Sequence, residues 1–333
     1  MSIYFFIYFF FSIQALKLEK YFSKISIILL LIFLTIFIGL RYEIGVDWDQ
    51  YIRIVEGYQY LQLKSIFLSP EIGYSFFSWI GSRFNNNIYI VNTLSAFLFT
   101  STLLAYCNKQ KYPWFSLVIS FPILIIVIAM GYTRQSCAIG LELLSLISAQ
   151  EGKYNKSIIY ILLASTFHTS ILPLIIVFLP LNYKKLLKIK FLIPFVILMI
   201  IGLYMFNSFF YNTFLNYLDN YIYNTYSSKG TAYRLFPSVV ASILLLINKN
   251  RFNYLYGKQN EIYFKIAILV IIITPIIIIF PENSTFVDRF ALFLIPISIY
   301  VFPRLIEINY LKLSRRTLSK HMKYLNYGHH YIR

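Results

Sequence analysis

Long apolar runs separated by short charged connectors dominate this chain. The opening "MSIYFFIYFFFSIQAL" is followed by blocks at 25–40, 88–106, 114–132, 157–179, 191–210, 236–247, 266–280 and 290–302. These blocks lack alternating polarity, so they predict helices rather than the strands of a membrane barrel. The expected fold class is all-α, a polytopic transmembrane helical bundle with about 10–12 membrane segments.

Composition supports this interpretation. The chain has 333 residues, of which 59% are hydrophobic and 20% aromatic, well outside the range of soluble globular proteins. The opening run lacks a basic leader and a small-residue cleavage site, so we expect it to stay as the first helix. Cys107 and Cys137 show no paired spacing. We therefore expect no disulfide framework, no metal site and no cofactor.

The net charge of +17 would suggest a nucleic-acid partner in a soluble protein, but its distribution argues against one. The basic residues fall mostly in short connectors, which are cytoplasmic loops by the positive-inside rule. They are Lys17, Lys20, Lys24, Lys109, Lys111, Lys153, Lys156, Lys184, Lys185, Lys188, Lys190, Lys249, Arg251, Lys258, Lys265 and the tail from Arg304.

Placing these connectors on one side requires an even number of crossings between each pair. Two adjustments achieve this. The segment "GYSFFSWIGSRF", 73–84, becomes a re-entrant or interfacial helix, and the run 157–180 folds back at "STFHTS" as a half-helix hairpin with His168 at its tip. The expected organisation is one multi-pass membrane domain, 1–303, with extracytoplasmic loops at 41–70 and 211–233, and a basic cytoplasmic tail, 304–333.

The outer side then holds the candidate chemistry. Arg134 lies between two apolar segments, where a charge is usually paired or functional unless it snorkels to the interface. His168 is either a packing residue or part of a polar site at a half-helix end. Asp47 and Asp49 flank Trp48. They could hold Mg²⁺, act as a base, or pair with nearby arginines.

Other catalytic signatures are missing from the sequence. It has no "GxSxG", Walker loop, "GxGxxG" or "HExxH", which disfavours a hydrolase, an ATPase or a zinc protease. Arginines and a histidine gathered with carboxylates instead suit a substrate with a diphosphate or another anionic head group, because arginine grips phosphate bidentately.

Five short motifs in register carry a family resemblance: "RYEIGVDWDQY", "PEIGYSFFSWI", "GYTRQSCAIG", "FHTSILPL" and "DRFALFLIP". With them the chain resembles the EpsG-type, Wzy-like polysaccharide polymerases of O-antigen, capsule or exopolysaccharide synthesis. The resemblance implies an enzyme of the bacterial cytoplasmic membrane that joins oligosaccharide units carried on undecaprenyl diphosphate at the outer face. The basic segment 304–333 departs from the family, which continues with hydrophobic sequence.

Such a transfer needs cations at the leaving diphosphate and a base for the acceptor hydroxyl. The expected cations are Arg41, Arg134, His168 and Arg289, with Gln135 donating hydrogen bonds. Asp47 is the first candidate base, followed by Asp49 or Glu71. Direct displacement would invert the anomeric configuration without a metal. The expected substrate-binding set is Asp49, Arg53, Glu71, Gln135, Arg234, Asp288 and Arg289, and Tyr58, Tyr60, Trp79 and the segment 211–233 are candidates for sugar stacking.

The expected partners are the lipid-linked donor and acceptor, membrane lipids, and the flippase and chain-length regulator of the same pathway, with no nucleic acid. Three alternatives stay open. They are a membrane glycosyltransferase that uses a lipid-monophosphate sugar donor, a transporter or flippase for the lipid-linked glycan, and an outer-face acyltransferase that uses His168.

Overall fold

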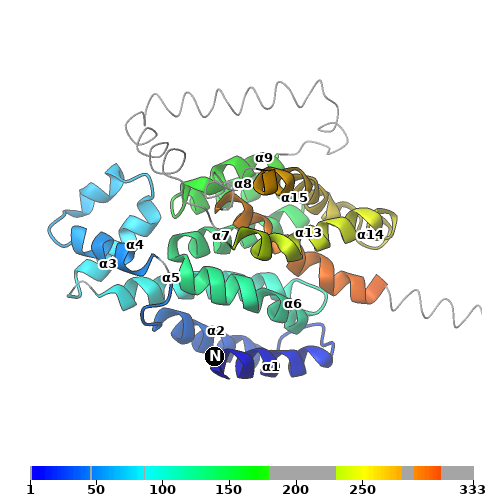
Figure 1. Ribbon diagram of the computed structural model, residues 1–333, viewed down its shortest axis with the longest axis horizontal. Coiled ribbons are helices and arrows are strands. Elements are labelled where there is room, and N and C mark those ends of the chain that lie inside the picture. The colour runs from blue at the N-terminus through cyan, green and yellow to red at the C-terminus, as the bar shows by residue number, and fades with distance from the viewer. Residues whose placement is uncertain (1, 46, 86, 180–229, 280–288, 309–333) are drawn as a thin grey trace, which may run out of the picture.

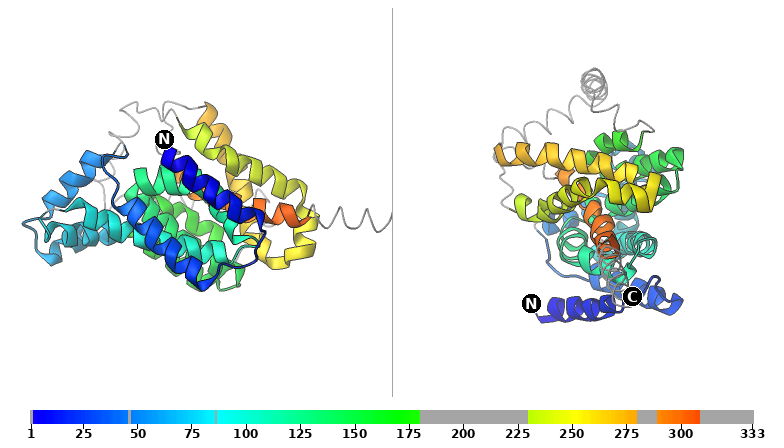
Figure 2. Two further views of the ribbon diagram at one scale, coloured as in Figure 1. Left: turned by 90° about the horizontal axis from the view of Figure 1, so that it is seen from below. Right: turned by 90° about the vertical axis from the view of Figure 1, so that its right-hand side faces the viewer.

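The computed structural model describes residues 2–45, 47–85, 87–179, 230–279 and 289–308, and every regular element among them is a helix. Figure 1 shows the arrangement. Helices α1 (Ser2–Leu16) and α2 (Lys24–Gly39) form a layer on one side of the molecule, and α13 (Thr231–Ile247) and α15 (Glu261–Ile279) lie on the opposite side (Figure 2).

Apolar blocks and helices coincide closely in the described residues. The blocks at 88–106 and 114–132 correspond to α5 (Ile88–Asn108) and to α6 (Pro113–Ser120) with its π-helical continuation η2 (Phe121–Ala129). Two helices, Ile88–Asn108 and Arg289–Ile308, are long and apolar enough to cross a membrane, and several shorter apolar helices accompany them. The number of crossings stays a prediction, and the block at 191–210 lies outside the described residues.

The fold-back expected near His168 is present. Helix α8 (Tyr154–Ser165) ends in a turn, and the chain returns against it as η3 (Thr169–Leu174) and α9 (Ile175–Phe178). His168 is the extended residue before η3, with φ −155°. The break therefore places an imidazole at the point where two short helices meet.

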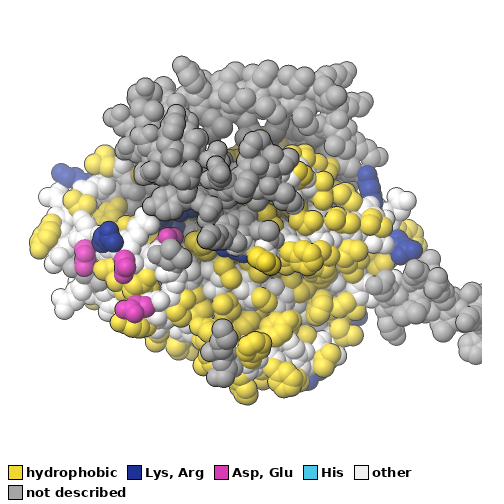
Figure 3. Space-filling model, viewed as in Figure 1, with side chains coloured by type: hydrophobic (Ala, Val, Ile, Leu, Met, Phe, Trp, Pro, Cys, Tyr) yellow, Lys and Arg dark blue, Asp and Glu magenta, His cyan; other side chains and the backbone are white. Residues whose placement is uncertain are grey.

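The segment 41–70, expected as a loop, contains helix α3 (Trp48–Gly57) and the short η1 (Leu63–Leu68). Helix α3 is amphipathic, because Trp48, Tyr51 and Val55 are buried at helical spacing while its other face is polar. Together with α4 (Ile72–Ser82) these elements form a lobe at one end of the molecule (Figure 1). On the face in Figure 3, acidic side chains gather over this lobe, whereas the middle is hydrophobic.

Helix α7 (Thr133–Gln150) is the central element and packs against α5 and α8. A Cβ at Gly140 would lie 2.6 Å from Thr102 Oγ1, so glycine allows the close approach to α5. On another side, the Ser145 and Ser157 hydroxyls donate to each other's carbonyl oxygens at 2.8 and 3.0 Å, joining α7 to α8. The middle of α7 is thereby held against both neighbours.

Several basic connectors lie together at the end opposite the lobe, and their side of the membrane stays a prediction. Lys109 pairs with Glu151 at 3.4 Å, and Lys111 pairs with Glu307 at 2.7 Å. Helix α14 (Lys249–Tyr256), followed by η5 (Gly257–Asn260), also lies at this end in Figure 1.

Two basic residues differ from their expected places in solvated segments. Lys265 is buried inside α15, where Nζ donates to Leu179 O at 2.8 Å. Arg304, expected to begin the tail, is buried in a helix that continues to Ile308. Each gains internal hydrogen-bond acceptors that a pattern of charges along the chain does not reveal.

Candidate functional site

Glu71 stands at the junction of the lobe and the α8–η3 break. Gly73 N donates to Thr166 O at 2.8 Å. A Cβ at Gly73 would lie 2.7 Å from Thr166 Oγ1 and 2.8 Å from the Phe167 ring. Only glycine lets the first turn of α4 dock this closely on the end of α8. The docking brings Glu71, directly before α4, beside His168.

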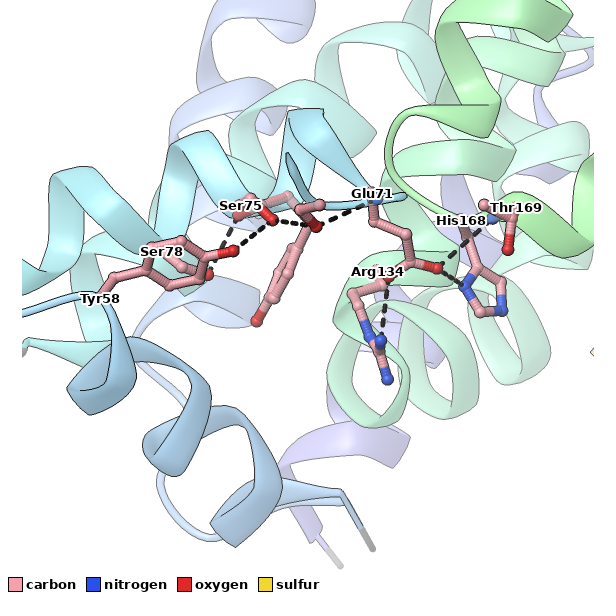
Figure 4. A network of polar contacts seen from close by, with 9 residues as sticks. Tyr58, Glu71, Ser75, Ser78, Arg134, His168 and Thr169 are labelled. Atoms are coloured by element: carbon pink, nitrogen blue, oxygen red, sulfur yellow. Dashed lines mark hydrogen bonds and ion pairs between the residues drawn. The ribbon is translucent and has the colours of Figure 1, made fainter. Parts of the chain in front are cut away.

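The Glu71 carboxylate joins three elements (Figure 4). Its Oε2 accepts a hydrogen bond from Arg134 Nη1 at 2.9 Å, and its Oε1 lies 2.7 Å from His168 Nδ1. The Thr169 amide donates to the same Oε1 at 3.4 Å. We call Glu71, Arg134 and His168 the outer network. It links the start of α4, the first turn of α7 and the tip of the fold-back.

A row of hydrogen-bonded hydroxyl groups ends at the backbone amide of Glu71. Tyr58 Oη donates to Ser75 Oγ at 2.7 Å, and Ser75 Oγ donates to Ser69 Oγ at 2.7 Å. Ser69 Oγ accepts from the Glu71 amide at 3.2 Å. This chain fixes the backbone of Glu71 and thereby the direction of its carboxylate. Tyr58 therefore contributes to the position of the site.

The outer network is largely removed from solvent. The side chains of Glu71, His168 and Arg134 are 12%, 9% and 19% exposed. Burial by itself raises the pKa of Glu71, but the hydrogen bond and charge of His168, followed by those of Arg134, outweigh it and lower the pKa to about 2. Glu71 is therefore ionised at neutral pH. It orients the imidazole through Nδ1 and leaves Nε2 turned away from it (Figure 4).

Arg134 has aromatic neighbours as well as its carboxylate. Its guanidinium carbon lies 5.7 Å from the ring centre of Tyr51 and 6.0 Å from that of Tyr74, within cation–π distance. Its Nε is buried without a hydrogen-bond partner. Glu71 therefore engages one nitrogen of the guanidinium, and the buried Nε keeps donor capacity for a further acceptor.

Arg41 lies next to the start of α7. All of its hydrogen-bond partners in the described part of the structure are neutral groups. Its guanidinium donates to Ile38 O at 2.9 Å, to Asn92 Oδ1 at 3.0 Å and to Thr133 Oγ1 at 2.5 Å. Burial lowers the pKa of Arg41 to about 10, so it remains protonated at neutral pH. Its positive charge is available to an anion beside the outer network.

Gly45 explains how the chain passes close to this place. It has φ +103°, and a Cβ there would lie 2.9 Å from Gly131. The two glycines let the segment between α2 and α3 cross the residues directly before α7. Arg41 and the first turn of α7 consequently meet.

Gln135 and Arg289 also meet at this end. Gln135 Nε2 donates to Arg289 O at 2.6 Å, and the Arg289 charge lies close enough to act on His168. The structure thus brings together six of the residues that the sequence suggested: Arg41, Glu71, Arg134, Gln135, His168 and Arg289.

The other expected residues lie elsewhere. Asp49 and Arg53 are on the exposed face of α3, and Asp47 is half-buried directly before that helix. Arg234 lies near the start of α13. Asp288 and most of the segment 211–233 fall outside the described residues.

Sequence reasoning missed the aromatic wall formed by Tyr51 and Tyr74, whose ring centres are 5.7 Å apart. Tyr74 Oη is buried without a partner, and burial raises the pKa of Tyr74 well above its ordinary value. The spacing of Trp48, Tyr51 and Val55 is the local signal that would have revealed the buried face of α3. Within the described ranges, no group of three or more His, Cys, Asp or Glu side chains is arranged to hold a metal.

The arrangement can bind an anion and move a proton. An oriented imidazole can accept a proton on Nε2, and buried guanidinium groups can stabilise negative charge on a departing group.

A family model described as the EpsG family matches residues 24–322. No curated protein and no solved structure shows significant similarity to the chain. The match spans α2 to α15 and the helix Arg289–Ile308, and so includes every residue of the outer network. The chain therefore belongs to the EpsG family.

Proposed function

We propose that this protein is a polysaccharide polymerase that joins lipid-linked oligosaccharide units by inverting glycosyl transfer. Family membership indicates a membrane protein with a role like that of a polysaccharide polymerase. The observation that carries the proposal is the 2.7 Å contact between Glu71 and His168 beside Arg134. It supplies a base and cations at one place.

In the proposed reaction, His168 Nε2 takes the proton of the acceptor hydroxyl. The hydroxyl oxygen forms a bond to the anomeric carbon of the donor as the bond from that carbon to the diphosphate oxygen breaks. The electron pair goes to the diphosphate. Glu71 stabilises the imidazolium that results, in the way that an orienting carboxylate stabilises a catalytic histidine.

Arginine charges assist departure of the diphosphate. Arg134 presents its unpartnered Nε, and Arg41 contributes a buried charge whose described partners are neutral. Cations placed where negative charge develops lower the barrier without a metal. We expect the carrier to be undecaprenyl diphosphate and the reaction to occur at the outer face of a bacterial cytoplasmic membrane.

The proposed base differs from the first candidate of the sequence analysis. Asp47 makes no side-chain hydrogen bond at the start of α3, whereas His168 is oriented by a buried carboxylate. An oriented group loses less freedom when it reacts. His168 is therefore the better base, with Asp47 as the alternative.

The test uses purified protein in liposomes with lipid-linked repeat units. Lengthening of the glycan supports a polymerase, whereas relocation of the lipid without lengthening would assign the same arginines to a flippase. A monophosphate-linked monosaccharide accepted in place of the diphosphate-linked unit would support the alternative glycosyltransferase. His168→Gln should lower the rate of lengthening by about 10²–10⁴-fold, and Arg251→Gln, exposed on α14 at the opposite end of the molecule, is the control.

A further inference from the structure

A carboxyl group without any described partner lies in the middle of α7. Glu142 is 0% exposed, and neither of its carboxylate oxygens has a hydrogen-bond partner. An unpaired carboxylate in such surroundings is costly, and acids inside membrane helices usually belong to sites that bind protons or ions. The proposed polymerase reaction makes no use of this residue.

Helical geometry shows on which face of α7 Glu142 lies. Seven residues separate it from Gln135, which is within about 20° of two full turns. Gln135 donates to Arg289 O at 2.6 Å, at the start of the helix Arg289–Ile308. At the far end of α7, Gln150 donates to Tyr263 Oη, and the Tyr263 ring stacks on Tyr300 of that helix at 3.4 Å. Glu142 lies between these two anchors along α7, and on the same face as Gln135, which contacts the helix Arg289–Ile308.

That helix is irregular at the same depth. The 3₁₀ turn η7 (Leu292–Leu294) interrupts it, and Pro296 follows. Ile295 N donates to Leu292 O at 3.3 Å, and Ser298 N donates to Ile295 O at 3.0 Å, instead of the regular α-helical bonds. Pro296 has no amide hydrogen to donate. A break at membrane depth frees backbone carbonyl groups, which in other membrane proteins bind small cations.

Glu142 and Pro296 lie equally far along their two helices. Glu142 is seven residues along α7 from Gln135, or about 10 Å of helix. Pro296 is also seven residues along its helix from Arg289, which contacts Gln135. The buried carboxyl group and the irregular turn are therefore at equal distances along their helices from the contact between Gln135 and Arg289.

We propose that Glu142 and the helix break at 292–296 form a binding site for one small monovalent cation, a proton or a sodium ion, which neutralises the carboxylate. The bound cation lets α7 pack against the helix Arg289–Ile308. Since Arg134 and Gln135 lie in the first turn of α7 and Gln135 contacts Arg289 of the other helix, occupancy of the site controls how these residues meet at the outer end.

Other titratable groups on α7 and the elements around it have partners or lie toward the helix ends. Those on α7 and α5 are Arg134, Cys137, Tyr89, Tyr106 and Cys107, and those on α8 and in the turn before it are Glu151, Lys153, Tyr154, Lys156 and Tyr160. Those on α15 and the helix Arg289–Ile308 are Glu261, Tyr263, Lys265, Arg289, Tyr300, Arg304 and Glu307, and His168, which pairs with Glu71, has its ring centre 6.4 Å from that of Phe293 in η7. No described contact joins any of them to Glu142.

The test measures thermal unfolding of the full-length protein in detergent as a function of pH, for the unchanged protein, Glu142→Gln and Glu151→Gln. Glu151, directly after α7, is the matched control because it pairs with lysines in an exposed turn. If the folded protein holds a proton that the unfolded chain has released, the folded protein loses stability as pH rises. The unfolding constant then increases by up to about tenfold per pH unit. We expect this loss in the unchanged protein and in Glu151→Gln, and its absence in Glu142→Gln.

Two further measurements separate the cations and guard against a variant that fails to fold. Sodium chloride, but not choline chloride, should restore stability at high pH if the site takes sodium. If the site takes only a proton, the infrared spectrum of the unchanged protein should contain the carbonyl band of a protonated carboxylic acid at neutral pH. Absence of both this band and any sodium dependence would overturn the proposal. Equal pH profiles in the unchanged protein and Glu142→Gln would also overturn it.

Discussion

The two ends of the bundle each contain a buried arginine in a polar network, but the networks differ in chemistry. At the basic end, the Arg304 guanidinium stacks 3.7 Å above the Tyr300 ring and donates to Gln110 Oε1 at 2.7 Å. The Tyr300 hydroxyl donates to Asn260 Oδ1 at 2.6 Å. We call Arg304, Tyr300, Gln110 and Asn260 the inner network. It joins the end of α5, η5 and the helix Arg289–Ile308 through rings and amides.

The outer network instead pairs an arginine with a carboxylate and an imidazole. An unpartnered atom does not distinguish the two ends, because both Arg134 Nε and Arg304 Nε are buried without a partner. The difference is the Glu71–His168 pair at 2.7 Å, which can accept and hold a proton. The comparison assigns the inner network a role in stabilising the helix bundle, and it agrees with our proposal that the outer network is the reactive one.

The largest expected effect separates catalysis from stability. His168→Gln should lower the rate of glycan lengthening by about 10²–10⁴-fold, because the base is lost, with little change in the unfolding temperature. Tyr300→Phe should leave the rate per folded molecule unchanged and cost about 1 kcal/mol of stability, because it removes one buried hydrogen bond. Single-turnover kinetics and thermal unfolding measure both. Equal turnover in the two variants would contradict the assignment.

The second effect concerns the inner network. Arg304→Ala should reduce the free energy of unfolding by about 2–4 kcal/mol, since it removes a buried cation–π contact and a charge-assisted hydrogen bond. Arg304→Lys should recover part of the loss, because an ammonium group also stacks on tyrosine. Denaturant titration measures the free energy. A loss of turnover in Arg304→Ala without destabilisation would move the inner network into the active site.

A smaller effect distinguishes the fork of Arg134 from its charge. Arg134→Lys should lower kcat/KM roughly 10-fold to 100-fold, because lysine keeps the charge but loses the planar arrangement of donors. Arg251→Lys, exposed on α14 at the opposite end of the molecule, provides the comparison and should behave like the unchanged protein. Full activity of Arg134→Lys would rule out bidentate recognition at this position.

The last effect is a pH dependence from Glu71. Its pKa is lowered from 4.5 to about 2 in the folded protein, so the stabilisation is complete above about 4.5 and is lost as pH falls through 2. The stability difference between the unchanged protein and Glu71→Gln should therefore not narrow from pH 7 to about pH 5 and should narrow below that. Thermal unfolding along this pH series measures it. A difference that narrows already near pH 6 would mean that Glu71 is not held ionised by its neighbours.

The apolar pattern alone determined most of the helices. Long runs without alternating polarity have few ways to satisfy their backbone other than as helices, and the break near His168 follows from the even number of crossings that the lysine connectors require. Helix α3 was missed because its apolar positions are spaced within a charged stretch, and its stability depends on packing of Tyr51 and Val55 against α4 and α5.

Some residues of the site could also be predicted from the sequence alone. Arg134 and His168 stand out because each is an ionisable residue within apolar sequence, which is costly and so draws attention. The sequence favoured Asp47 over Glu71 as the catalytic base, because two carboxylates flanking a tryptophan form a more conspicuous local pattern.

Only the tertiary structure decided which of these groups act together. Glu71 meets Arg134 across 63 residues and His168 across 97, and no local period links such distant positions. Their meeting depends on the close approach of α4 to α8 that Gly73 permits. Whether a segment is buried depends mainly on how apolar its own residues are, so the sequence alone can predict it. The partner of a buried charge depends instead on which helices pack together.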